Sequence, residues 1–170
     1  MYSKNLFKGF HPNPNGTESI ILQNETIKGN WVTGGYHEHL KREVCFAEDK
    51  RDDDIGHLIV ISGLADWNMP KPLTAFEVIP ETVCQFTGLK TYWSDEEIPY
   101  EADVWERDLL EVEYEGKKVI AEVRYEAGMF VLVSSDFANY CMPLFAVVIR
   151  EDDYWVQAKK VGNVFIAFNC

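Results

Sequence analysis

The stretch LLEVEYEGKKVIAEVRYEAGMFVLVS, residues 109–134, holds the most regular alternation in the chain. Apolar and charged side chains alternate along its first two runs, the period of two that a half-buried strand shows. Glu115-Gly116 and Ala127-Gly128 separate the runs, and glycine readily takes the positive φ of a tight hairpin turn. The third run, Met129 to Val133, is apolar throughout, which is typical of a central strand covered on both faces. The stretch therefore predicts a three-stranded antiparallel meander.

Short apolar and β-branched runs flank the meander, separated by glycine, proline and asparagine turns. They fall at residues 5–10, 19–22, 31–36, 57–62, 75–79, 82–86, 144–149, 154–157 and 161–168. Runs of this length and spacing are typical of a mainly β chain. A short helix is predicted within residues 100–107 and supplies the minor α content. The pair Gly34-Gly35 predicts a bulge or a close backbone approach.

The expected fold is a single domain over residues 1–170 with two parts. Residues 75–170 form the β core, in which the antiparallel meander belongs to an SH3-like, partly closed barrel. Residues 1–74 form an additional N-terminal β lobe that packs against this core. A chain of 170 residues with 46% hydrophobic content is long enough to bury one core of this kind.

Negative charge dominates the composition, with 28 acidic residues against 16 basic ones and a net charge of −12. Proteins hold nucleic-acid phosphates through lysine and arginine, so this balance argues against direct nucleic-acid binding. No signal peptide opens the sequence, and no apolar run approaches the roughly 18 residues that a membrane helix needs. We therefore expect a soluble, cytoplasmic protein without a membrane partner. Its four cysteines are expected to be free thiols, with Cys84 in the core.

His37 and His39 are the candidate metal ligands, because residues two apart in a strand share one face. Cys45, His57 or the run Asp52-Asp53-Asp54 would complete such a shell. The alternative is a surface strand end with two ordinary histidines beside a solvated acidic turn. We expect this second arrangement, with no metal and no cofactor.

Catalytic motifs are missing from the sequence, which holds no G-x-S-x-G, no glycine-rich phosphate loop and no H-E-x-x-H. Glu111 and Glu113 share one strand face, and the alternation explains them as the wet side of a sheet rather than as an acid–base pair. The chain is therefore not expected to be an enzyme. A metal-dependent enzyme that uses His37 and His39 is the alternative.

One stretch, residues 92–105, combines acids with large aromatic side chains and is too irregular to be core. Tyrosine and tryptophan often anchor protein interfaces. The stretch is a binding surface if these side chains are exposed, and a lid over the meander if they fold back. Its candidate partner-binding residues are Tyr92, Trp93, Asp95, Glu96, Glu97 and Trp105.

Residues 78–90, VIPETVCQFTGLK, resemble the run P-E-T-V-G-Q-F-T-G-L-K of the YopX family of phage and prophage proteins. The segments WERDLL at 105–110 and VGNVF at 161–165 are similar to the W-E-N-D-I-V and V-I-G-N-I-Y runs of that family. Two more segments agree with it, FKG at 7–9 and GNWVTG at 29–34. The resemblance thus spans almost the whole chain.

The departures from the family pattern concern the surface as well as the core. Cys84 stands where the family usually has glycine, a longer acidic and aromatic insert over 91–104 replaces a D-K-N-G-K-E-I turn, and the N-P-E-L-L tail is absent. The resemblance implies a mainly β, oligomeric protein that a phage or another mobile element encodes and that acts in a bacterial host cell. It implies no definite activity, because the family is named without an established biochemistry.

Together these patterns predict a non-enzymatic, self-associating binding protein. We expect it to dock on a host or phage protein through the acidic and aromatic surface. An alternative is that the acidic surface imitates nucleic acid and inhibits a host defence or nucleic-acid-binding protein, which requires carboxylates spaced along a strip like phosphates.

Overall fold

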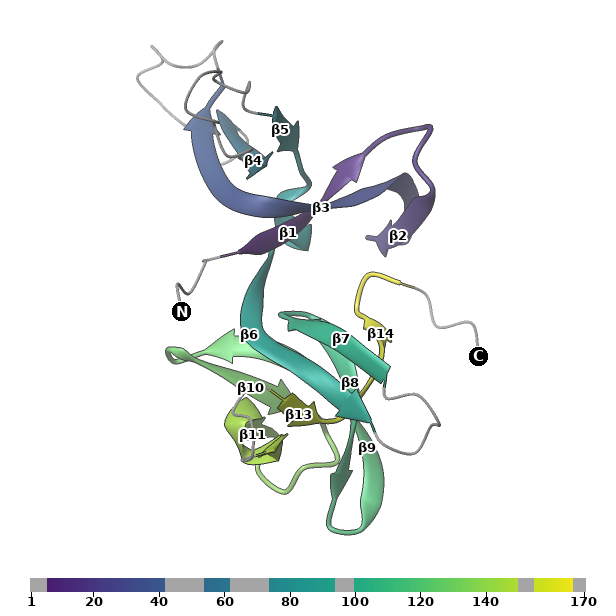
Figure 1. Ribbon diagram of the computed structural model, residues 1–170. Helices are drawn as coiled ribbons and strands as arrows, with labels where there is room; N and C mark the ends of the chain where they lie inside the picture. The colour runs from purple at the N-terminus through teal and green to yellow at the C-terminus, as the bar shows by residue number, and fades with distance from the viewer. Residues whose placement is uncertain (1–5, 42–53, 62–73, 94–99, 150–154, 167–170) are drawn as a thin grey trace. The chain divides into compact units, whose positions relative to one another are not determined.

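The computed structural model describes residues 6–41, 54–61, 74–93, 100–149 and 155–166. Strands dominate these residues, which contain short 3-10 helices and no α-helix, so the prediction of a mainly β chain is confirmed. The chain divides into two compact units, Tyr2–Cys84 and Gln85–Cys170 (Figure 1). The division thus lies after Cys84, whereas the sequence placed it after residue 74. None of the helices in the described ranges has the length and apolar character to cross a membrane.

Strand β3 organises the first unit. Its first part pairs antiparallel with β2, its middle with β1 and its last part with β4, and β4 pairs with β5. The most deeply buried large apolar side chains of this unit come from three strands. They are Phe10, Ile20 and Ile59, all at most 1% exposed. The elements are β1 (Phe7–Pro12), β2 (Glu18–Leu22), β3 (Glu25–Leu40), β4 (Ile55–Ile61), β5 (Thr74–Glu77) and the 3-10 helix η3 (Pro80–Thr82).

Gly34 marks the point where β3 leaves β1 and takes up β4 as its neighbour, since Phe7 pairs with Gly34 and Val60 with Gly35. A Cβ on Gly34 would lie 2.3 Å from the backbone oxygen of Val60, closer than any real contact. A Cβ on Gly35 would meet nothing nearer than 3.8 Å. The predicted close backbone approach is therefore confirmed, at the first glycine of the pair.

Helix η3 explains the P-E-T part of the most specific sequence run. Pro80 begins the helix, where its missing N–H costs nothing. Thr82 is fully buried, and its Oγ1 donates a hydrogen bond to the oxygen of Ile79 and accepts one from the backbone N–H of Phe10, at 2.6 and 2.9 Å. A buried N–H needs such an acceptor, so Thr82 ties η3 to β1.

The second unit is built on a five-stranded antiparallel sheet in the order β11-β10-β9-β8-β14. Beside this sheet, β6 pairs antiparallel with β7 and parallel with β13, and β13 pairs with β12. The strands are β6 (Cys84–Trp93), β7 (Tyr100–Trp105), β8 (Asp108–Tyr114), β9 (Lys117–Glu126), β10 (Met129–Val133), β11 (Cys141–Pro143), β12 (Val148–Ile149), β13 (Trp155–Gln157) and β14 (Lys159–Asn163), with the 3-10 helix η4 (Leu144–Val147).

The meander of β8, β9 and β10 is confirmed, with both tight turns where the glycines predict them. Both turn residues have positive φ in each hairpin, 50° and 75° at Glu115-Gly116 and 50° and 87° at Ala127-Gly128. This is the turn geometry that matches the twist of a hairpin. The central strand of the sheet is β9, not β10 as predicted, although consecutive residues of β10, Val131 and Leu132, are both buried.

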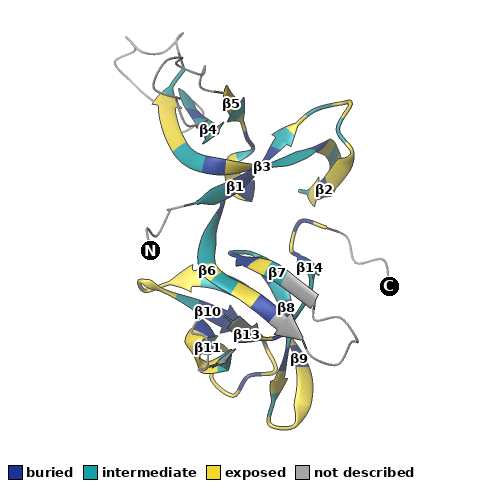
Figure 2. Ribbon diagram, in the orientation of Figure 1, coloured by how far each residue is buried: buried dark blue, intermediate teal, exposed yellow. Residues whose placement is uncertain are grey.

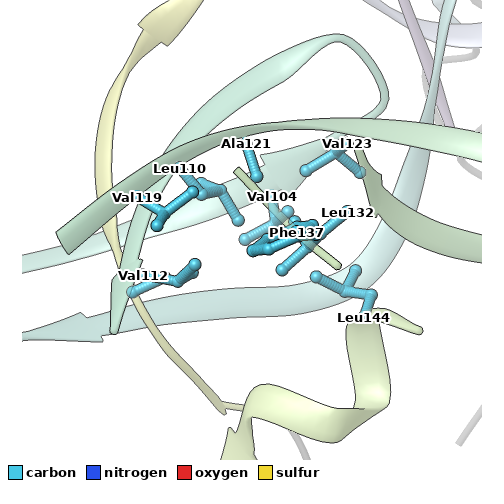
Figure 3. Close-up of a cluster of buried hydrophobic side chains, with 10 residues drawn as sticks. Val104, Leu110, Val112, Val119, Ala121, Val123, Leu132, Phe137 and Leu144 are labelled. Atoms are coloured by element: carbon cyan, nitrogen blue, oxygen red, sulfur yellow. The ribbon is translucent and has the colours of Figure 1, made fainter. Parts of the chain in front are cut away.

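The core of the second unit lies on one face of this sheet (Figure 3). Alternate residues in the middle of β8 and β9 point into it, namely Leu110, Val112, Val119, Ala121 and Val123, and the residues between them are more exposed (Figure 2). The alternation in the sequence therefore identified the buried face correctly. The cluster consists of Val104, Leu110, Val112, Val119, Ala121, Val123, Leu132, Phe137, Leu144 and Ala158.

Three expectations need correction. Residues 100–107 form strand β7 and a turn instead of a helix, and the run 144–149 is mostly helix η4 instead of a strand. Among the described residues the five-stranded sheet ends at β11 and β14 and does not close into a barrel. The pairing of β7 with β6 explains the first error, because a strand partner distant in sequence overrides a weak local helix preference.

Candidate binding surfaces

The predicted acidic and aromatic surface falls on the hairpin of β6 and β7. Tyr92 and Trp93 end β6, and the pairing places Tyr92 opposite Glu101 and Trp93 opposite Tyr100. The connection between the two strands carries Asp95, Glu96 and Glu97, which lie outside the described residues. The register therefore brings three aromatic residues to the end of the hairpin that carries these acids.

Trp105, the sixth predicted binding residue, lies at the other end of β7 and is buried. Its side chain is 7% exposed, and its ring packs against Phe86 with the ring centroids 5.0 Å apart. At this end of the predicted stretch the side chain folds inward and belongs to the core of the second unit.

Next to Trp105, the corner from β7 to β8 is held by an ion pair between a buried carboxylate and a partly exposed lysine. Asp108 is completely buried, and its Oδ2 accepts a hydrogen bond from the backbone N–H of Trp105 at 2.8 Å. The same oxygen lies 2.6 Å from the Nζ of Lys160, which also donates to the backbone oxygen of Asp103. These contacts join β7, β8 and β14, so the corner is a structural site.

The candidate metal ligands that lie in the described ranges do not gather. His37 and His39 are exposed residues of β3, on the strand face opposite the one where Glu38 lies across from His57. Cys45, Asp52 and Asp53 lie outside the described ranges. Within those ranges no three histidine, cysteine or acidic residues are grouped so that they could hold a metal ion.

His57 instead takes part in a hydrogen-bonded row with Tyr36 and Glu38. The Tyr36 hydroxyl donates to Oε1 of Glu38 at 2.9 Å and lies 2.5 Å from Nδ1 of His57. Because the hydroxyl has one hydrogen, Nδ1 of His57 supplies the hydrogen of the second bond. Burial, the bond to Glu38 and the charge of Glu38 raise the pKa of Tyr36 to about 12, so this hydroxyl stays protonated and is no nucleophile at neutral pH.

A small groove opens at the end of β5 in the first unit, with a volume of about 370 Å³. The oxygen of Glu77 accepts a hydrogen bond from Nδ1 of His11 at 2.8 Å, which fixes this ring and leaves its Nε2 as the free nitrogen. The carboxylates of Glu77 and Glu81 are exposed. The groove is lined by His11, Pro12, Glu77, Val78, Ile79 and Pro80.

Glu111 and Glu113 lie on the outer face of the five-stranded sheet, as the wet-side interpretation predicts. Glu111 pairs with Lys118 at 3.1 Å, and Glu113 is exposed. Glu122 on the same face is held between Arg107 and Arg124, at 2.7 and 2.6 Å. Burial by itself would raise the pKa of Glu122, but the hydrogen bonds and charges of the two arginines hold this pKa below its usual value.

We expect Glu122→Gln to remove an acid-sensitive contribution to stability. A carboxyl with a lowered folded-state pKa stabilises the fold above its unfolded pKa, and this contribution is lost as the pH falls through the folded-state pKa. The thermal unfolding midpoint of the wild type should therefore drop more steeply than that of the variant below about pH 5. Circular dichroism at a series of pH values measures this, with Glu113→Gln as the exposed control. Parallel curves for wild type and Glu122→Gln would contradict the expectation.

The predicted core cysteine is confirmed, because Cys84 is fully buried and its Sγ donates to the backbone oxygen of Thr82 at 3.2 Å. Cys141 is an exposed free thiol, and Cys45 and Cys170 lie outside the described ranges.

Comparison of the chain with known protein families, with curated proteins and with solved structures finds no match.

Proposed function

We propose that this chain is a non-enzymatic, self-associating binding protein that docks on another protein through the end of the β6–β7 hairpin. The observation that carries the proposal is the register of this hairpin. Tyr92, Trp93 and Tyr100 flank a six-residue connection that contains three consecutive acids, Asp95 to Glu97. Aromatic residues beside charges of one sign are a common composition for an interface with a partner of opposite charge.

The charge balance of the whole chain supports a basic partner. With a net charge of −12, the protein attracts basic surfaces at long range and repels other acidic proteins. The origin proposed for it is a phage or prophage, as the resemblance to the YopX family implies, and its place of action is the cytoplasm of the bacterial host. We also propose an SH3-like arrangement of strands for the second unit. The β8–β9–β10 meander and the paired strands β6 and β7 support it.

Neutralising the three acids should strongly reduce capture of the partner while the fold is kept. We expect the triple variant Asp95→Asn, Glu96→Gln, Glu97→Gln to recover at least tenfold less of the captured protein from a bacterial lysate, measured by quantitative mass spectrometry. The matched control removes the same charge elsewhere, with Glu113→Gln, Glu115→Gln and Asp136→Asn at exposed positions. Equal losses in both triple variants would mean that only net charge matters.

The nucleic-acid mimic is a special case of the same surface, and the same experiment identifies it. A partner that normally holds phosphates would be released by added duplex DNA and would bind less tightly as salt rises. A captured protein that duplex DNA does not displace would rule the mimic out and leave the general binding function in place.

A further inference from the structure

Strand β2 presents backbone hydrogen-bonding groups on its outer edge. It forms a two-residue hairpin with β3 through Gln23-Asn24, whose φ values of 50° and 67° are those of the tight turn. Such a hairpin closes with a bonded pair, here Leu22 and Glu25, and bonded pairs then recur at every second residue. The N–H and C=O groups of Ser19 and Ile21 therefore point away from β3, and in the described part of the chain β2 pairs with β3 alone.

Both terminal strands of the five-stranded sheet, β14 and β11, carry features that hinder pairing with another chain. Strand β14 has Lys159 and Lys160 and a bulge beside them, and β11 is three residues long and ends in Pro143. Strand β2, with the sequence ESIIL, has no lysine, no proline and no bulge. The side chain of Ile21 is 42% exposed on it. An edge of this kind favours the addition of a further strand.

The arrangement of these groups fits a second copy of the same strand. A twofold axis midway between the Ile20 residues of two antiparallel copies would place Ser19 of each copy opposite Ile21 of the other. The outward N–H and C=O groups of the two residues would then form four hydrogen bonds, two around each such pair. Glu18 would lie opposite Leu22, so no acid faces an acid in spite of the negative charge of the chain.

We infer that β2 is the strand through which two copies of this chain pair edge to edge. The inference locates the self-association that belongs to the proposed function, and it rests on that part of the proposal. Because a strand of five residues on each side buries little surface, the dimer is expected to be weak and to form only at high protein concentration.

Two substitutions at the edge test the inference. Ile21→Lys places a charge on the exposed side chain, and Ser19→Pro removes an outward N–H that β3 does not use, which an edge strand tolerates. The control Ile120→Lys makes the same charge change at a residue of β9 that is 51% exposed. Adding a positive charge to an acidic protein weakens general repulsion between copies, so a loss of association in Ile21→Lys cannot come from charge repulsion.

Sedimentation velocity over a concentration series into the millimolar range gives the result. We expect a wild-type dimer, at least tenfold weaker association in both edge variants and unchanged association in Ile120→Lys, with circular dichroism confirming that all are folded. A dimer that both edge variants leave intact would overturn the β2 interface but not self-association. A wild-type monomer at every concentration would overturn both.

Discussion

Replacing Asp108 with alanine should lower the free energy of unfolding of the second unit by about 3 kcal/mol, the lower end of the range for breaking a buried ion pair, because the Lys160 side chain left behind is partly exposed. The carboxylate is fully buried and serves both the Nζ of Lys160 and the backbone N–H of Trp105. Alanine leaves a lysine ammonium and a buried N–H without this acceptor. Asp108→Asn keeps an oxygen for the N–H of Trp105, so it should cost about 2 kcal/mol.

Urea unfolding followed by residue-specific amide hydrogen exchange measures the loss and shows where it occurs. The amides of β8 and β9 should lose protection, while Asp136→Ala, a change at an exposed acid, should alter stability by less than about 0.5 kcal/mol. The double variant Asp108→Asn, Lys160→Met should recover part of the loss, because an apolar pair leaves no uncompensated charge. A loss below about 1 kcal/mol in Asp108→Ala would show that the corner does not depend on this pair.

Gly34→Ala should destabilise the first unit by about 3 kcal/mol, the upper end of the usual cost of overpacking. The new methyl group would lie 2.3 Å from the backbone oxygen of Val60, and a backbone atom cannot move aside as a flexible side chain can. The clash falls where β3 changes its partner from β1 to β4. To relieve the clash, either β4 must shift relative to β3 or the pairing of β3 with β4 near Gly34 must be lost.

The neighbouring Gly35→Ala is the matched control for this prediction. Its methyl group would meet nothing nearer than 3.8 Å, and alanine has a lower conformational entropy cost than glycine in a strand. We expect a stability within about 0.5 kcal/mol of the wild type. Thermal unfolding of the two variants side by side gives the comparison, and equal stabilities would show that the approach of Gly34 to Val60 imposes no constraint.

The parts of the fold that the sequence predicted correctly are those that neighbouring residues determine. Alternation in β8 and β9 identified the buried face, and the two X-Gly turns set the hairpins, because pleating and turn geometry are local properties. The position of β9 at the centre of the sheet could not be predicted in this way. It depends on β11 and β14, which join the two sides of the sheet from distant parts of the chain.

The errors in the predicted fold also arise from contacts between distant parts of the chain. The short helix predicted within residues 100–107 does not form, because pairing with β6 makes Tyr100–Trp105 the strand β7. The position of the division between the units also depends on distant contacts. Phe76 pairs with Ile59, and Thr82 accepts a hydrogen bond from Phe10, so residues 75–84 belong to the first unit.

The candidate surface was predictable in composition but not in detail. The clustering of acids and aromatics is visible in the sequence, and the register adds Tyr100 and Glu101 opposite Trp93 and Tyr92. The burial of Trp105 was not predictable, because it follows from its contact with Phe86 across the β6–β7 pair. Likewise the row from His57 to Glu38 through Tyr36 needs the alignment of β3 with β4, which no local pattern contains.

Hydrogen–deuterium exchange of the protein with and without its captured partner tests the binding account most directly. The account predicts slower exchange in peptides that cover residues 92–101, at the end of the β6–β7 hairpin, and unchanged exchange in the β9–β10 hairpin around Ala127-Gly128. Protection confined to other parts of the chain, with residues 92–101 exchanging as in the free protein, would contradict it.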